Sequence, residues 1–88
     1  MTRIEQIEQR LRAALAPAEL SIVDEGHKHV GHAGAKDGRG HFHVHIVSDA
    51  FIGKRPLERH RMVYAALGEL MQTDIHALGV DAQTKEHS

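Results

Sequence analysis

The sequence predicts an α/β (α+β) domain in which a three-stranded mixed sheet carries helices on one face. Apolar residues recur at helical spacing in two segments and alternate in three others, in the order helix, strand, strand, helix, strand. The 88 residues are enough for one hydrophobic core. We expect the first two strands to pair antiparallel, and the second and third to run parallel through a right-handed helical crossover.

The chain should begin with an amphipathic helix over residues 2–15. Thr2 and Glu5 have the spacing of a capping box, and Pro17 ends the segment. Four apolar residues at helical spacing form the predicted buried stripe: Ile4, Ile7, Leu11 and Leu15. Residues 20–24 alternate in polarity and predict a short strand.

Residues 26–40 form a glycine-rich segment that we expect to be a long loop, and it carries His27, His29 and His32. The segment HFHVHIV over 41–47 follows, and its alternation predicts the clearest strand of the chain. One face of that strand should present Phe42, Val44 and Ile46, and the other His41, His43 and His45. We interpret these three histidines as a solvated strip that gains charge in mild acid.

A turn through Gly53 should lead into a second helix that starts at Pro56 and runs to about Gln72. Its predicted buried residues are Leu57, Val63, Tyr64, Leu67 and Leu70 or Met71. A last strand is expected over 75–80, followed by the polar segment DAQTKEHS. We therefore expect one domain over 1–82 and a polar tail over 83–88.

Composition restricts the classes of function. The formal charge of −1 gives no bulk electrostatic case for binding nucleic acid or an anionic membrane. Cysteine is absent, which excludes disulfides, thiolate catalysis and any iron–sulfur site built by this chain alone. No signal-like or membrane-spanning stretch is evident, so we expect a cytoplasmic protein that is a monomer alone, with homodimerisation through sheet edges left open.

Four segments carry a family resemblance. They are VSDAFIGKRPLERHRMVYAAL (47–67), VDEGHKH (23–29), GHFHVHIV (40–47) and IHAL (75–78). Together they resemble the BolA-like family over about residues 1–82. The resemblance implies a class II KH-like fold and a monothiol glutaredoxin with a Cys-Gly-Phe-Ser active site as partner. It also implies a [2Fe–2S] cluster shared with that glutaredoxin and its glutathione, in iron–sulfur trafficking or iron and redox regulation.

The resemblance places the cluster ligands on histidines. The C-terminal ligand falls on His76 and the loop ligand on His29, while His41 occupies a position where many relatives have histidine. Two imidazoles cannot hold a [2Fe–2S] cluster, which needs four ligands, so a partner would supply thiolates. The sequence departs from the family pattern in two places. Extra histidines at 27 and 32 are weaker candidates for the loop ligand, and histidines stand at 43 and 45, where apolar or basic residues are more usual.

Two other functions remain open. A KH-like, DNA-binding transcriptional regulator of stress response and cell shape would use the basic residues Lys54, Arg55, Arg59 and Arg61. In an adaptor, Lys54, Arg55 and Arg59 would instead help to dock the glutaredoxin. The second glycine of a KH phosphate loop is missing there, and Pro56 stands in its place. A histidine-only metal-binding protein would take Zn²⁺, Cu²⁺ or Ni²⁺. No serine or carboxylate pair lies in a catalytic motif, so we do not expect an enzyme.

Overall fold

The three strands form a single mixed sheet in the order β1-β2-β3. A computed structural model describes residues 2–25 and 40–85 of the chain. β1 (Glu19–Asp24) pairs antiparallel with β2 (Gly40–Val47), which pairs parallel with β3 (Ile75–Gln83). The predicted strand order and directions are confirmed. Most of the expected glycine-rich loop, including His27, His29 and His32, lies outside the described residues.

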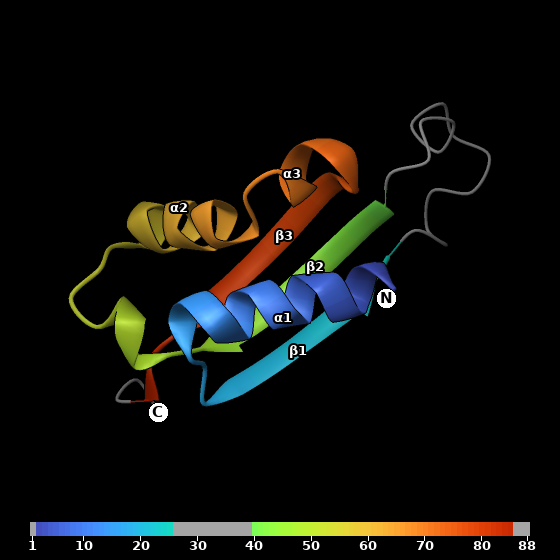
Figure 1. Ribbon diagram of the computed structural model, residues 1–88. Coiled ribbons are helices and arrows are strands. Elements are labelled where there is room, and N and C mark those ends of the chain that lie inside the picture. Colours follow the sequence, from blue (N-terminus) through green and yellow to red (C-terminus); the bar gives the residue numbers. More distant parts are fainter. Residues whose placement is uncertain (1, 26–39, 86–88) are drawn as a thin grey trace.

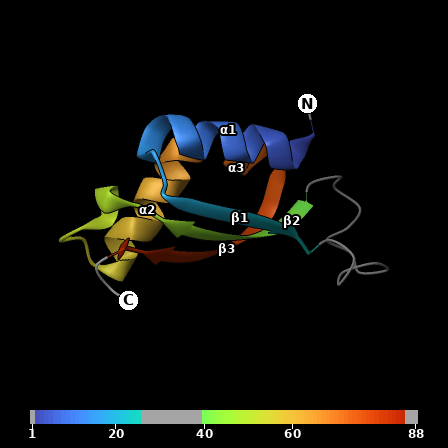
Figure 2. The same ribbon diagram turned by 90° about the horizontal axis from the view of Figure 1, so that it is seen from below.

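The helix α1 (Arg3–Leu15) begins at the predicted capping box. The hydroxyl of Thr2 accepts from the amide of Glu5 at 3.1 Å, and the Glu5 carboxylate accepts from the amide of Thr2 at 2.8 Å. The helix ends where Ala16 turns left-handed, with φ of 43°, just before Pro17. Figure 2 shows α1 lying on one side of the sheet.

The core lies between the sheet and the helices. Its buried residues come from α1, β2, the helices that follow and the start of β3: Ile7, Leu11, Leu15, Phe42, Val44, Ile46, Phe51, Val63, Leu67, Leu70 and Ile75. The expected burial of Leu57 and Tyr64 is wrong, because these side chains are 60% and 40% exposed. They stand seven positions apart on a flank of their helix, whereas Val63 and Leu67 face the sheet.

The second helix is shorter than predicted. After the 3₁₀ turn η3 (Asp49–Phe51), α2 runs over Pro56–Leu67, and a separate short helix α3 covers Leu70–Thr73. Gly68 separates them with a φ of 55°, a backbone conformation that glycine adopts without strain. β3 then continues to Gln83, three residues beyond the strand expected over 75–80, so the first three residues of the polar segment DAQTKEHS are strand.

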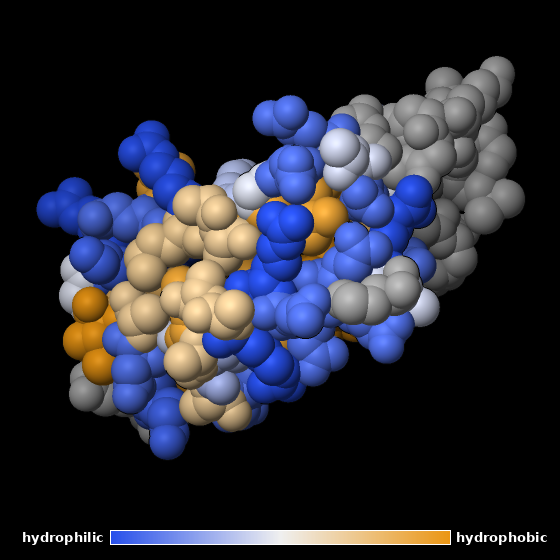
Figure 3. Space-filling view, in the orientation of Figure 1, coloured by the Kyte–Doolittle hydropathy of each residue, from blue (hydrophilic) through white to orange (hydrophobic). Residues whose placement is uncertain are grey.

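The face that carries the helices is largely hydrophilic (Figure 3). A band of moderately hydrophobic residues crosses part of α1 and α2 in that view, and a shallow groove there is lined by Gln9, Arg10, Ala13, Ala14 and Ala66. The opposite face of the sheet, which we call the open face, has none of the described helices packed on it (Figures 1 and 2). No helix in residues 2–25 and 40–85 is long and apolar enough to cross a membrane.

Candidate functional site

Two of the predicted ligand residues lie together at one end of the sheet. The rings of His41, near the start of β2, and His76, near the start of β3, have centroids 4.9 Å apart and planes tilted by 53°. His76 is exposed and His41 is half-buried. The structure thus pairs the C-terminal histidine with the histidine that precedes Phe42.

An irregularity in strand pairing brings the two rings together. Gly40 pairs with Ile75, but the next residue, His41, pairs with Ala77, so His76 is an extra residue in β3. Such a bulge changes the direction in which a side chain points and is often found beside functional sites. The backbone around it is held by the amide of Gly40, which donates to the carbonyl of Asp74 at 2.9 Å. Polarity alternation predicts regular strands, so no pattern in the sequence indicates this bulge.

The start of α1 contacts the turn that precedes β3. The Arg3 guanidinium lies 3.4 Å from the carboxylate of Asp74, two residues before His76. The hydroxyl of Thr73 donates to that carboxylate at 2.6 Å. The turn that leads into His76 is therefore fixed by an ion pair and a short hydrogen bond, although both pair members are partly exposed to solvent.

Within the part of the chain that the structure describes, no group of three or more metal-ligating side chains occurs. The other predicted ligand, His29, lies outside that part, as do the weaker candidates His27 and His32. The pair of His41 and His76 therefore offers at most two imidazole ligands, fewer than the four that a [2Fe–2S] cluster requires. These two imidazoles match half of the ligand set of a cluster shared with a partner protein.

The basic residues lie at the other end of the sheet (Figure 1). Lys54, Arg55 and Arg61 are exposed, but Arg59 is partly buried, and its guanidinium donates to the carbonyls of Lys54 at 2.9 Å and Ala82 at 3.0 Å. Ala82 lies six residues beyond His76 along β3, roughly 20 Å at strand rise. The two sets of predicted site residues are therefore spatially separate.

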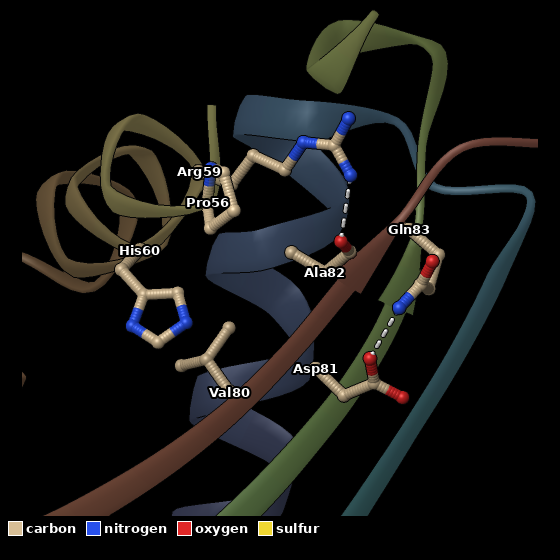
Figure 4. Close-up of a pocket in the computed structure, with 7 residues that line it drawn as sticks. All are labelled: Pro56, Arg59, His60, Val80, Asp81, Ala82 and Gln83. Carbon is tan, nitrogen blue, oxygen red and sulfur yellow. Dashed lines mark hydrogen bonds between the residues drawn. The ribbon is translucent and has the colours of Figure 1, made fainter. Parts of the chain in front are cut away.

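A cavity of about 270 Å³ adjoins this basic end, between the start of α2 and the end of β3 (Figure 4). Its lining residues are Pro56, Arg59, His60, Val80, Asp81, Ala82 and Gln83. In Figure 4 the ring of His60 points towards Val80. Before it, Gly53 has a φ of 78° and supplies the predicted turn. Because Arg59 already bonds two carbonyls, its clearest role in the fold is to join the turn before α2 to β3.

Comparison with known proteins decides the family. The family model described as BolA-like protein matches residues 11–87. The chain belongs to the BolA-like family. It is 46% identical over 80 residues to the DNA-binding transcriptional regulator BolA of Escherichia coli, covering 91% of this chain and 73% of that protein.

Solved BolA structures share the fold across the whole domain. The BolA domain of SufE1 from Arabidopsis thaliana has a TM-score of 0.88 and 36% identity, covering 100% of this chain and 98% of the other. BolA1 from the same organism has a TM-score of 0.85 and 38% identity, covering 100% and 97%. The α+β fold predicted from the sequence is therefore that of a BolA protein.

Some BolA relatives are longer than this chain. The alignment with the SufE-like protein 1 of Arabidopsis thaliana, at 39% identity, spans 90% of this chain but only 23% of the relative. For protein BOLA1 of the same organism, at 40% identity, the shares are 98% and 56%. The BolA-like domain thus occurs both as most of a protein and as a part of a larger one.

Proposed function

We propose that this BolA-like chain is an adaptor that binds a monothiol glutaredoxin and shares a bridging [2Fe–2S] cluster with it, in iron–sulfur trafficking or iron and redox regulation. The observation that carries the proposal is the pair of His41 and His76, with ring centroids 4.9 Å apart at one end of the sheet. His76 is the proposed principal ligand because it is exposed and occupies the family's C-terminal histidine motif. The second ligand is His29 or His41.

The chemistry of the donor set favours a shared cluster over one held by this chain alone. The chain has no cysteine, so thiolates must come from a partner. A monothiol glutaredoxin with bound glutathione supplies two of them, and two imidazoles then complete the four ligands. Replacing thiolate by imidazole raises the reduction potential of a cluster and makes its ligation sensitive to protons.

The deciding experiment is an anaerobic titration of the chain into cluster-loaded monothiol glutaredoxin, followed by visible circular dichroism. We expect a changed spectrum that saturates at one equivalent and is lost with His76→Ala. His60→Ala, which removes a histidine on α2, is the matched control and should leave the spectrum of the mixed complex intact. An unchanged spectrum after His76→Ala would refute the proposed ligand, and no change on mixing would refute the adaptor role.

The same titration identifies the second ligand. We compare His29→Ala with His41→Ala, because each removes one of the two imidazole candidates and leaves His76 in place. The variant that lacks the true ligand should shift the spectrum and release iron faster to a chelator. If both variants behave as the unmodified chain does, neither His29 nor His41 is the second ligand.

A second candidate function is DNA binding, because the Escherichia coli relative is named a DNA-binding transcriptional regulator. The exposed Lys54, Arg55 and Arg61 would contact phosphates. If they do, replacing Lys54 and Arg55 by glutamine should weaken binding for all DNA sequences and reduce the logarithmic salt slope by roughly one per lost contact. His76→Ala should leave DNA binding unchanged. An unchanged salt slope in the glutamine variant would exclude this surface.

A further inference from the structure

Two histidines lie side by side on the open face and take no part in the site proposed above. His43 and His45 are two residues apart in β2, so both point to that face, with Cα atoms about 6.5–7 Å apart. Across β3 they pair with Gly79 and Asp81, and across β1 with Val23 and Ser21. His41, the third histidine of this strand face, packs instead against His76.

The neighbours of His45 fix its ring and its tautomer. Its Nδ1 lies 2.7 Å from Oδ2 of Asp81. A carboxylate only accepts hydrogen bonds, so Nδ1 carries the proton and Nε2 of the neutral ring has a free lone pair. The other carboxylate oxygen, Oδ1, accepts from the side-chain amide of Gln83 at 2.7 Å. Asp81 is thus held on both oxygens, while its side chain and that of His45 remain 43% and 40% exposed.

The position of His43 depends on the glycine across from it. A methyl group at Gly79 would lie 2.6 Å from Nδ1 of His43. The imidazole therefore occupies the space that the side chain of any other residue at position 79 would need. The ring therefore leans across β3, next to the residue pair formed by His45 and Asp81. Side chains that start from alternate positions of one strand face can each bring one nitrogen to a common ion.

The electrostatic surroundings favour a cation. None of the three strands contains a lysine or an arginine. Asp81 adds a negative charge, and hydrogen bonds from Gln83 and His45 lower the pKa of its carboxyl group. Metal-bound histidines commonly donate their second ring N–H to a carboxylate, which orients the ring and raises its basicity. The pairing of His45 with Asp81 has this arrangement before any metal binds.

We propose that His43 and His45 chelate a zinc ion on the open face, with Asp81 as the carboxylate that orients His45. Imidazole donors suit Zn²⁺, and water completes a coordination shell to which the described residues add no third ligand. Such a site is open and exchanges its ion readily. It is separate from the proposed cluster site, because neither His41 nor His76 takes part.

The test is a titration of the full, metal-free chain with Zn²⁺, followed through the imidazole nitrogens by long-range ¹H–¹⁵N NMR. We expect Nε2 of His43 and of His45 to shift together, while Nδ1 of His45 keeps its proton. Resolving each ring separates this site from the loop histidines, from His76 and from His87. Shifts confined to those other histidines would overturn the proposal.

Variants give an independent check on the same site. Asp81→Asn should weaken Zn²⁺ binding at His43 and His45 by about 10–100-fold, the usual effect of losing an orienting carboxylate. Asp49→Asn, at an exposed carboxylate in η3, is the matched control and should change nothing. His76→Ala should abolish the glutaredoxin spectrum but leave this zinc site intact, so failure of one proposal is distinguishable from failure of the other. Equal affinities for Asp81→Asn and the unmodified chain would refute the role of Asp81.

Discussion

Ser48 offers the sharpest test of how the fold is held together. It is the only polar side chain among the buried residues of the described part of the chain, at 1% exposure. Its hydroxyl donates to the carbonyl of Leu15 and accepts from the amide of Ala50 at 3.1 Å. Leu15 is the last residue of α1, so its carbonyl has no partner within the helix. One hydroxyl thus joins the end of α1, the end of β2 and the 3₁₀ turn.

Replacing Ser48 by alanine should destabilise the domain by roughly 2–4 kcal/mol. A net hydrogen bond contributes about 1 kcal/mol, and a buried group left without its partner adds about 1–3 kcal/mol of desolvation cost. For a domain of this size, each kcal/mol corresponds to about 4–8 °C in Tm.

The assay is equilibrium urea unfolding, with the m value compared between the variant and the unmodified chain. Ser21→Ala, at an exposed serine of β1, is the matched control and should change the free energy of unfolding by no more than about 0.5 kcal/mol. A loss below about 1 kcal/mol for Ser48→Ala at an unchanged m value would show that the hydroxyl does not hold these elements together.

Two further predictions concern α2 and α1. Leu67 is fully buried, so Leu67→Ala should lower the free energy of unfolding in urea by about 2–5 kcal/mol. The side chain of Leu57 is 60% exposed, so Leu57→Ala should lower it by about 0.5 kcal/mol or less. Equal losses for the two variants would refute the assigned orientation of α2. The amide of Thr2, which donates to the Glu5 carboxylate, holds the pKa of Glu5 below its usual value. The stabilisation by Glu5 is therefore present above the usual carboxyl pKa and is lost as the pH falls through the lowered one. Glu5→Gln should remove this pH dependence, and an identical unfolding profile against pH in both proteins would contradict it.

Short-range patterns predicted most of the fold because they act through the local backbone. The capping box of Thr2 and Glu5 depends on residues three apart, and the structure has both of its hydrogen bonds. The alternation over 41–47 depends on the pleat, and β2 buries Phe42, Val44 and Ile46 as predicted. In such segments the position of a residue along the element decides the direction in which its side chain points.

The features that the sequence did not predict depend on contacts between segments that are distant in the chain. Leu57 and Val63 are equally apolar, and only the position of the sheet decides which of them is buried. Gly68 could have continued the helix at a cost of about 1 kcal/mol, but α3 packs separately after a left-handed turn. Likewise, the bulge at His76 arises from the register of β3 on β2, which no local pattern encodes.

The open face shows how neighbouring strands give similar residues different chemistry. The three histidines of β2 have the same spacing and should behave alike as a solvated strip, but each meets a different partner across β3. His41 meets the bulge and packs against His76, His43 lies over Gly79, and His45 bonds to Asp81. The roles that we propose differ accordingly: the first ring is a candidate ligand for the shared cluster, and the other two rings are the proposed zinc ligands. Because the basic residues lie at the other end of the sheet from His76, substitutions at the two ends would test the proposed cluster role and the proposed DNA role separately.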